Sequence, residues 1–485
     1  MRQLNPWDAA FLYRETRAAP QHICGVSHFA PDPHGQRLTL DEVRSAVTRR
    51  LPLLPPFRQR LARVPFGLAR PYWADDPDVD IDSHLYEVTL PPPGNRIQLA
   101  EQVAQIAARP LDLSRPPWEI HLISGLEGGQ SALVTKYHHA AVDGLASGEI
   151  LTTLLDPAPD WPQTPARDAP QPGPVPGASE MLLRGLADAA GYPIQMMHSQ
   201  QRMMTSTQRM LGLACEPGQE TWRRRSASPG SIRPGWQAPM FGAPPTPFNG
   251  TLTRNRCWAF GQVPLDQVKL IKNTLGGTVN DVVGAICAAA LRRWLLDRGA
   301  LPREPLVAMI PVSLRTDDDR GTFGNRVSMM LAALPTTLAD PVQRLQAASA
   351  ALGAAKRVHS AKGGDFLADA LRFVMPMMAA PAYRMAAEMP SPSLPRYPAN
   401  LYISNVPGPS GPLYLAGKQM LTLYPAAFLP RGVGLNMVVL SYSGSLDFGL
   451  MACPDLLPDV WSLMDYVVEA VDELTEVAQG VSTAS

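Results

Sequence analysis

His138-His139-Ala140-Ala141-Val142-Asp143-Gly144 is the stretch that indicates both the fold and the chemistry of this chain. The segment before it, 132–137, reads Ala-Leu-Val-Thr-Lys-Tyr, a largely apolar and β-prone run. The two histidines are therefore expected where a buried strand ends. Transfer of an acyl group to an alcohol needs a base that is neutral near physiological pH, and histidine suits this task best. We take His139 as the candidate general base and His138 as the neighbour that orients the strand.

Asp143 follows His139 by four residues and completes the candidate catalytic set. It would either fix the tautomer of the imidazole, as in a catalytic triad, or hold the loop by pairing with a cation elsewhere. Gly144 has no side chain, which permits a tight turn or the close approach of a substrate. A metal site and a purely structural histidine pair are the alternatives. Against a metal, no His-Glu-x-x-His or Cys-x-x-Cys pattern is present, and neighbouring strand residues face opposite ways.

The motif and four further segments together resemble the bacterial wax ester synthase/diacylglycerol acyltransferase family. This family belongs to the superfamily of chloramphenicol acetyltransferase, the plant alcohol acyltransferases and the condensation domains of peptide synthetases. The further segments occur in the family's order and span nearly the whole chain: Leu4–Leu12, Pro116–Glu119, Thr278–Val283 and Ser404–Pro409. Pro117 departs from the Pro-Leu-Trp that the family usually carries at the second segment.

The resemblance implies an α+β fold of two chloramphenicol acetyltransferase-like lobes with an active-site tunnel at their interface. It also implies a partner for Asp143, because Arg315 matches the arginine that pairs with the motif aspartate in relatives. Residues 321–326, which read Gly-Thr-Phe-Gly-Asn-Arg, match the Phe-Gly-Asn segment that follows this arginine. Asn280 has two open roles at a helix start. It would direct an amide towards an oxyanion, or it would cap the helix together with Asp281.

Proline divides the chain into lobes. Eight prolines crowd residues 157–176, and a second Pro-Gly-rich patch covers 229–250, so both read as connections. We expect a first lobe at 1–155, a Pro-rich connector with a Met-rich helix at 156–248 and a second lobe at 249–485. Thr39 and Thr278 are typical helix caps, while 306–312 and 327–334 read as strands. Strands and helices without strict βαβ alternation favour α+β lobes.

Composition excludes several classes of protein. Lys plus Arg equals Asp plus Glu at 43 each, so no net charge favours nucleic acid. Five scattered cysteines without paired spacing indicate a reduced, cytoplasmic environment. Charged residues interrupt the N-terminal apolar residues, and no later stretch is long enough for a transmembrane span, so we expect a protein that is soluble or bound to a surface.

Two methionine pairs and one Met-Leu pair recur every seven residues in the connector, at Met196-Met197, Met203-Met204 and Met210-Leu211. Such a face either contacts an acyl chain or lipid surface, at the inner membrane or a lipid droplet, or packs against the second lobe. A second cluster has the same two interpretations and comprises Met375, Met377, Met378, Met385 and Met389. Arg223-Arg224-Arg225 would suit anionic headgroups or a CoA phosphate, or would be a solvated charge run.

The resulting hypothesis is an acyl-CoA-dependent O-acyltransferase that esterifies a long-chain fatty alcohol or diacylglycerol to wax ester or triacylglycerol. Acyl-CoA is a co-substrate, and we expect no metal and no permanently bound cofactor. Transfer would be direct, because the chain has no Gly-x-Ser-x-Gly elbow and no cysteine near the motif in sequence. The alternatives are another alcohol, a carrier-protein thioester as donor, or a lipid-droplet-binding protein without catalysis.

Overall fold

The strand expected before the two histidines is β7 (Ser131–His138), and all eight of its residues are buried. In this computed structural model, the described residues are 1–162, 176–214, 242–315, 323–363, 366–372, 376–388 and 397–484. β7 lies inside a six-stranded sheet between two antiparallel neighbours. Side chains cover both faces of this sheet, which explains why the strand reads as an apolar run instead of an alternation.

The first sheet has the strand order β12-β13-β2-β7-β6-β5. Helices α2 and α5 pack against one face, and α4 packs against the other. The strands besides β7 are β2 (His22–Phe29), β5 (Leu85–Thr89), β6 (Trp118–Ser124), β12 (Tyr414–Leu415) and β13 (Lys418–Ala426), and the helices are α2 (Leu40–Arg50), α4 (Arg96–Ala108) and α5 (Gly144–Leu154). Thr39 caps α2 with a capping box, as its sequence predicts.

The second sheet has the order β10-β9-β11-β14-β15-β8. Its central strand β11 runs parallel to both neighbours, and the remaining pairs are antiparallel. The strands are β8 (Cys257–Pro264), β9 (Leu306–Ser313), β10 (Val327–Leu334), β11 (Leu401–Val406), β14 (Leu435–Tyr442) and β15 (Ser445–Ala452). The helices that share its largest apolar core are α7 (Leu265–Leu275), α8 (Val279–Leu296) and α12 (Val460–Ala484), with α9 (Pro341–Lys362) packed on α8.

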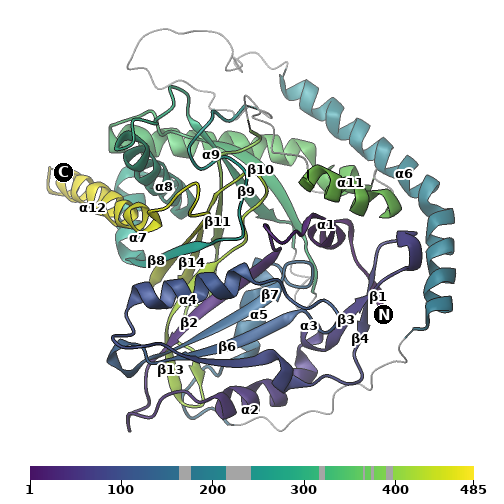
Figure 1. The fold of residues 1–485 in the computed structure, drawn as a ribbon. Helices are drawn as coiled ribbons and strands as arrows, with labels where there is room; N and C mark the ends of the chain where they lie inside the picture. The colour runs from purple at the N-terminus through teal and green to yellow at the C-terminus, as the bar shows by residue number, and fades with distance from the viewer. Residues whose placement is uncertain are drawn as a thin grey trace.

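The expected boundary at residue 249 needs one correction. β12 and β13 come from the 249–485 region, yet β13 pairs with β2 and thereby extends the first sheet. The two lobes therefore interlock, with β13 also contacting β14 and β15 (Figure 1). Gly449 allows this crossing, because a Cβ there would lie 1.7 Å from the carbonyl oxygen of Pro425. Strand pairing of this kind depends on tertiary contacts that a local pattern does not encode.

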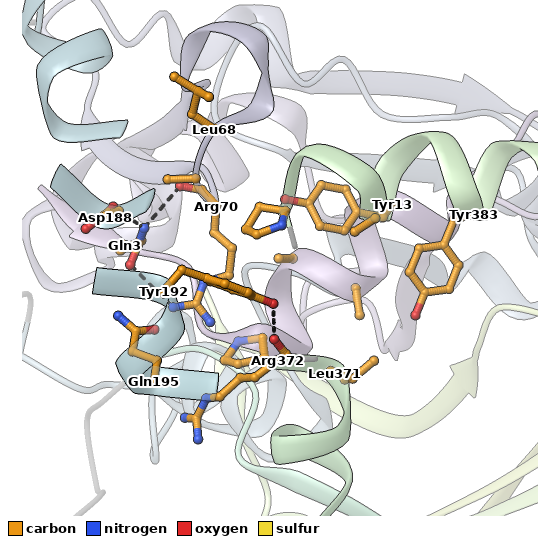
Figure 2. A pocket seen from close by; sticks show the side chains of 16 residues that line it. Gln3, Tyr13, Leu68, Arg70, Asp188, Tyr192, Gln195, Leu371, Arg372 and Tyr383 are labelled. Atoms are coloured by element: carbon orange, nitrogen blue, oxygen red, sulfur yellow. Dashed lines mark hydrogen bonds between the residues drawn. The ribbon is translucent and has the colours of Figure 1, made fainter. Parts of the chain in front are cut away.

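The connector contains the expected helix, α6 (Ala178–Ala214), which runs along the outside of the molecule (Figure 1). Its side chains meet those of other elements in a small pocket (Figure 2). The helices and short turns near this pocket are α1 (Pro6–Arg14), η2 (Pro65–Gly67), α10 (Phe366–Arg372) and α11 (Pro376–Glu388). The remaining elements are β1 (Arg2–Gln3), β3 (Gln59–Ala62), β4 (Tyr72–Asp75), η1 (Leu51–Leu53), α3 (Pro55–Arg58), η3 (Ile81–His84) and η4 (Glu127–Gly129). Most of the proline run, at 163–175, lies outside the described residues, as does 215–241.

Candidate active site

A cavity of about 330 Å³ lies between the two lobes, at the end of β7. This volume is within the range of small-molecule sites in proteins. The first lobe contributes residues of α1, β2, β7, α5 and the turn between β7 and α5, and strands and loops of the 249–485 region supply the remainder. Apolar side chains dominate the wall, among them Phe11, Ile23, Leu151, Met329, Leu423, Phe428, Val438 and Leu440. The polar groups in it include His139, Asp143, Ser147, Asn405 and Asn436.

His139 lines this cavity with its imidazole held between two aromatic rings. The ring stacks on Phe11, with centroids 4.1 Å apart, and meets Phe428 edge-on at 5.4 Å. Its backbone N–H donates to the carbonyl of Gln21 at 2.8 Å, and its carbonyl accepts from Asn325 Nδ2 at 2.5 Å. Nδ1 is buried without a hydrogen-bond partner among the described residues. No hydrogen bond to Nε2 is found within the described residues, so we take Nε2 as the ring nitrogen that can meet a ligand.

Burial in this apolar wall controls the protonation of His139. It lowers the pKa of the imidazole from 6.5 to about 4, and the opposing attraction of Asp143 is too weak to restore it. The imidazole is consequently neutral near physiological pH. A neutral imidazole with one open nitrogen can accept a proton from a hydroxyl group.

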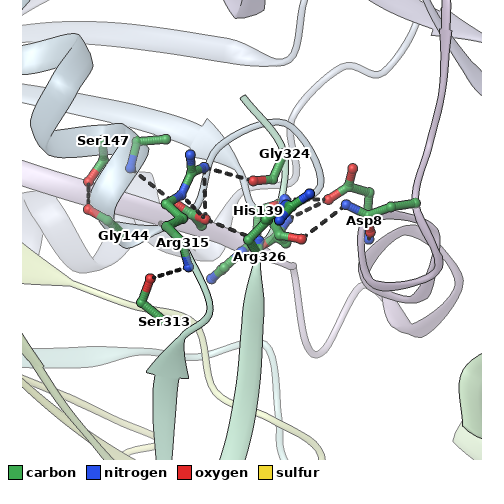
Figure 3. Close-up of polar contacts among 12 residues, drawn as sticks. Asp8, His139, Gly144, Ser147, Ser313, Arg315, Gly324 and Arg326 are labelled. Atoms are coloured by element: carbon green, nitrogen blue, oxygen red, sulfur yellow. Dashed lines mark hydrogen bonds and ion pairs between the residues drawn. The ribbon is translucent and has the colours of Figure 1, made fainter. Parts of the chain in front are cut away.

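Asp143 adopts the second of its two possible roles. It caps α5 through Oδ1, which accepts from the backbone N–H of Ala146 at 2.8 Å. Its Oδ2 accepts from Nε and Nη2 of Arg315 at 3.2 and 3.1 Å, and Arg315 also donates to the carbonyl of Gly324 at 2.8 Å (Figure 3). Both side chains are more than nine-tenths buried. The pair joins the lobes, and no hydrogen bond connects Asp143 with the imidazole of His139 among the described contacts.

His138 points away from the cavity. Its buried ring accepts from the N–H of Ala140 at 3.1 Å through Nδ1, and Nε2 lies 3.4 Å from Glu15 Oε2. Its place outside the cavity wall corrects the prediction that grouped it with the catalytic residues. The reason is the alternation of a strand, which sends neighbouring side chains to opposite sides. Its contacts are those of a residue that holds the strand end.

Asn280 and Asp281 begin α8, and Thr278 caps the helix with Asp281 in a capping box, as its sequence predicts. Asp281 Oδ2 also accepts from Ser349 Oγ at 3.2 Å, so this carboxylate makes structural contacts. The side chain of Asn280 is exposed and accepts from Asn405 Nδ2 at 2.6 Å. Asn405 lines the cavity, whereas Asn280 lies outside its wall. The geometry therefore favours the structural role of Asn280 over the oxyanion role.

Gly144 lines the cavity as the first residue of α5. A Cβ there would lie 3.5 Å from Val406 Cγ2, an ordinary contact distance, so the turn does not require glycine for space. What this position offers the cavity is a backbone N–H in the first turn of a helix, where intrahelical acceptors are missing.

Two functional candidates, Asp8 and Asn325, were not identified from the sequence. Asp8 Oδ1 accepts from both the backbone N–H and Nδ2 of Asn325, each at 2.8 Å, and the same amide donates to the carbonyl of His139. Burial raises the pKa of Asp8 to about 6. Both residues lie in segments that matched the family pattern, and this was the one available signal. The chain Asp8–Asn325–His139 fixes the backbone that carries the imidazole.

Cys24 is a third residue that was not identified from the sequence, because it is far from the motif along the chain. It lies on β2 and lines the cavity. Burial raises the pKa of its thiol to about 12, which keeps it protonated and a poor nucleophile. Within the described part of the chain, no group of three His, Cys, Asp or Glu side chains is arranged to hold a metal ion.

Two interlocked α+β lobes with a buried histidine at their shared cavity define an acyltransferase of the chloramphenicol acetyltransferase type. Comparisons with known proteins narrow this class. The catalytic-domain model of wax ester synthase/diacylglycerol acyltransferases matches residues 4–283, and the C-terminal-domain model of the same proteins matches 323–475. The chain belongs to the wax ester synthase/diacylglycerol acyltransferase family and is an acyltransferase.

Relatives cover nearly the full length of the chain. A putative diacylglycerol O-acyltransferase of Mycobacterium tuberculosis H37Rv is 38% identical over 482 residues, which cover 98% of this chain and 90% of that protein. A wax ester synthase/diacylglycerol acyltransferase from Marinobacter aquaeolei VT8 has a similar structure, with a TM-score of 0.66, 28% identity and coverage of 98% and 100%. The starter condensation domain of rhizomide synthetase shares the fold at a TM-score of 0.54 and 16% identity, with coverage of 99% and 94%. The family and the two-lobed fold expected from the motifs are confirmed.

Proposed function

We propose that the protein transfers an acyl group from acyl-CoA to the hydroxyl of a long-chain fatty alcohol, of diacylglycerol, or of both. The observation that carries the proposal is a neutral imidazole in the wall of a largely apolar cavity. An apolar wall favours acyl and alkyl chains, since each buried methylene contributes about 0.8 kcal/mol. The products would be wax ester or triacylglycerol.

The proposed reaction is one direct displacement with His139 as base. Nε2 takes the hydroxyl proton while the alcohol oxygen attacks the thioester carbonyl carbon. The carbon–sulfur bond then breaks, and the imidazolium gives its proton to the departing CoA thiolate. The scheme involves no covalent acyl-enzyme, and the thiol in the wall, Cys24, is protonated and therefore a poor nucleophile for forming one. No metal and no resident cofactor takes part in this scheme.

The start of α5 supplies the donors that we assign to the developing oxyanion. Gly144 and Leu145 both line the cavity, and their backbone N–H groups have no hydrogen-bond partner within the described ranges. Donors aimed at a charge that appears in the transition state are among the largest contributors to acyl transfer. The positive end of the helix dipole adds to them. In this scheme Asp143 acts indirectly, by fixing the helix start and the lobe interface.

A panel of acceptors with one donor tests the proposal. Release of free CoA from palmitoyl-CoA is measured with hexadecanol, with a diacylglycerol and with ethanol. We expect release with one or both long-chain acceptors and little with ethanol, because ethanol leaves the apolar wall empty. Release that is equal for ethanol would contradict the assigned acceptor class. If the protein consumed an acyl-carrier-protein thioester but no palmitoyl-CoA, the carrier-protein thioester would be the donor instead of acyl-CoA.

The pH dependence of turnover follows from the lowered pKa of His139. The folded-state value of about 4 lies below the ordinary 6.5, so the neutral base persists as pH falls through this interval. We expect kcat/KM for CoA release to stay level above about pH 5 and to fall only near the folded-state pKa. The same shift makes the contribution of His139 to stability fall as pH decreases from 6.5 towards 4. An acid limb centred near 6.5 would contradict the assignment.

For location, we propose a cytoplasmic protein that contacts the inner membrane or lipid droplets at its surface. Among the described helices, none is by itself long and apolar enough to cross a membrane; the pair α7 and α8, bent by 101°, meets the criterion only when counted together. Several methionines of α6 and α11 are exposed, including Met197, Met204, Met378 and Met385. The exposure of these four side chains supports lipid contact, while α6 also packs against α9 and α10. The side chain of Met210, together with Met375, Met389 and Arg223–Arg225, lies outside the described residues.

A further inference from the structure

A second, smaller cavity of about 50 Å³ lies on the far side of α1 from His139. α1 separates the two cavities, since Phe11 stacks on His139 while Ala10 and Tyr13 line the smaller one. α6, α10, α11, β1 and residues 68–70 line the remaining sides (Figure 2). The acyl-transfer scheme makes no use of this pocket.

Positive charge is in excess in the wall of this pocket. Its charged lining residues are Arg70, Arg372 and Asp188. Asp188 Oδ2 already accepts from Gln3 Nε2 at 2.7 Å and from Tyr72 Oη at 2.6 Å, so it forms no close ion pair with either arginine in the described contacts. Arg70 is partly buried and has no carboxylate as a hydrogen-bond partner among the described contacts, which is costly unless a ligand neutralises its guanidinium.

Arg70 has hydrogen-bond donors to spare. A guanidinium carries five N–H donors. Within the described residues, Arg70 uses its side chain for one long bond, from Nη2 to Gln3 Oε1 at 3.4 Å. Burial and the positive charge of Arg372, which lines the same pocket, lower the pKa of Arg70. Arg372 donates to Asp369 at 2.7 Å, and Asp369 is shared with Arg202. The pocket therefore suits an anion that accepts several hydrogen bonds, such as a phosphate group.

The elements around the pocket carry apolar side chains outwards. Phe66 on η2 is 84% exposed and has a φ of 58°, a left-handed conformation that is unusual for a bulky residue. η2 contacts both α6 and α11. On α6 the exposed apolar residues recur at helical spacing: Leu183, Leu186, Ile194, Met197 and Met204. On α11 they are Met377, Met378 and Met385, and Tyr383 of the same helix lines the pocket.

We propose that this pocket binds the phosphate of an anionic phospholipid while Phe66 and the exposed faces of α6 and α11 contact the acyl chains of the same leaflet. Apolar side chains beside paired guanidinium groups match the two parts of such a lipid. A second copy of the chain is the poorer occupant. A two-fold symmetric contact would bring the arginine pocket against itself, and like charges would repel.

Flotation of the purified full-length chain with vesicles tests the proposal without relying on turnover. One vesicle type contains phosphatidylcholine alone, and the other contains phosphatidylcholine mixed with phosphatidylglycerol. We expect tighter binding to the mixed vesicles. The double variant Arg70→Gln/Arg372→Gln should bind them about 30-fold more weakly, since each basic residue near an anionic surface contributes about one kcal/mol.

Two matched variants separate a built site from general attraction. Arg254→Gln/Arg303→Gln removes two charges from exposed positions elsewhere and should bind as the unmodified protein does. Arg70→Lys/Arg372→Lys keeps the charge but loses the planar donor geometry, and it should still bind the mixed vesicles more weakly. Thermal melting checks that each variant is folded.

Three results would overturn the proposal. Equal weakening by the pocket and control variants would assign binding to bulk charge alone. Wild-type binding by the lysine variant would show that the pocket does not recognise the phosphate. A lipid-free dimer that dissociates in Phe66→Ser/Met378→Gln would instead make this face an interface between copies.

Discussion

Replacing His139 with alanine is expected to lower kcat for CoA release by about 100- to 10,000-fold, the usual contribution of a general base. The physical reason is that Nε2 of this ring is the atom assigned to remove the hydroxyl proton, and the described residues of the cavity wall include no second imidazole. Phe11 and Phe428 should still pack around the smaller residue, so the fold is expected to survive. The effect is measured as the rate at which free CoA thiol is released from palmitoyl-CoA in the presence of hexadecanol or diacylglycerol.

His28→Ala is the matched control for this variant. His28 is also a neutral ring in apolar surroundings, because burial lowers its pKa to about 4, and it packs edge-on against Phe260 and Tyr424. It lies outside the cavity wall. We expect His28→Ala to lose about as much stability as His139→Ala, but to keep the kcat of the unmodified protein. An equal loss of kcat in both variants, or full turnover by His139→Ala, would remove His139 from the role of base.

Replacing Asp143 with alanine is expected to reduce the free energy of unfolding by about 3–5 kcal/mol, the usual result of removing one partner from a buried ion pair. Arg315 would keep a buried guanidinium without its carboxylate, and α5 would lose its cap. Turnover should fall as well, because the helix start that carries Gly144 is held by this pair. Urea unfolding gives the stability, and the assay of free CoA gives kcat.

A double-mutant cycle identifies the source of that loss. Asp143→Ala/Arg315→Met removes both charges, and it should be less destabilised than the sum of the two single variants. Glu180→Ala is the surface control, because its ion pair with Arg184 is about half exposed on both sides and should contribute about 1 kcal/mol or less. Strictly additive losses at Asp143 and Arg315 would show that the pair does not join the lobes energetically.

Local elements of the fold could be predicted from the sequence, because short-range contacts determine them. The strand before His138, the helices capped by Thr39 and Thr278 and the strand at 327–334 all lie where their patterns place them. Capping and apolar runs act within a few residues, so they are visible locally. The joint order of the motifs then predicted the family and the two-lobed fold.

Long-range contacts decided the site, and most of them were not predictable. The pair of Asp143 and Arg315 was expected through the resemblance alone, since the residues are far apart in the chain. The link from Asp8 through Asn325 to His139 was not predicted, because it joins three segments that meet only after folding. The entry of β13 into the first sheet was also missed, since a strand pattern does not name its partner.

The sequence by itself determined that the two histidines lie where a buried strand ends and which family the chain resembles. Tertiary structure alone decided that Asp143 caps α5 and pairs with Arg315 without a hydrogen bond to the His139 imidazole among the described contacts, that His138 faces away, and that Met197, Met204, Met378 and Met385 are exposed. The physical reason is range. Periodicity and capping are fixed by neighbours along the chain, whereas burial, ion pairing and the lowered pKa of His139 depend on groups that only the folded chain brings together.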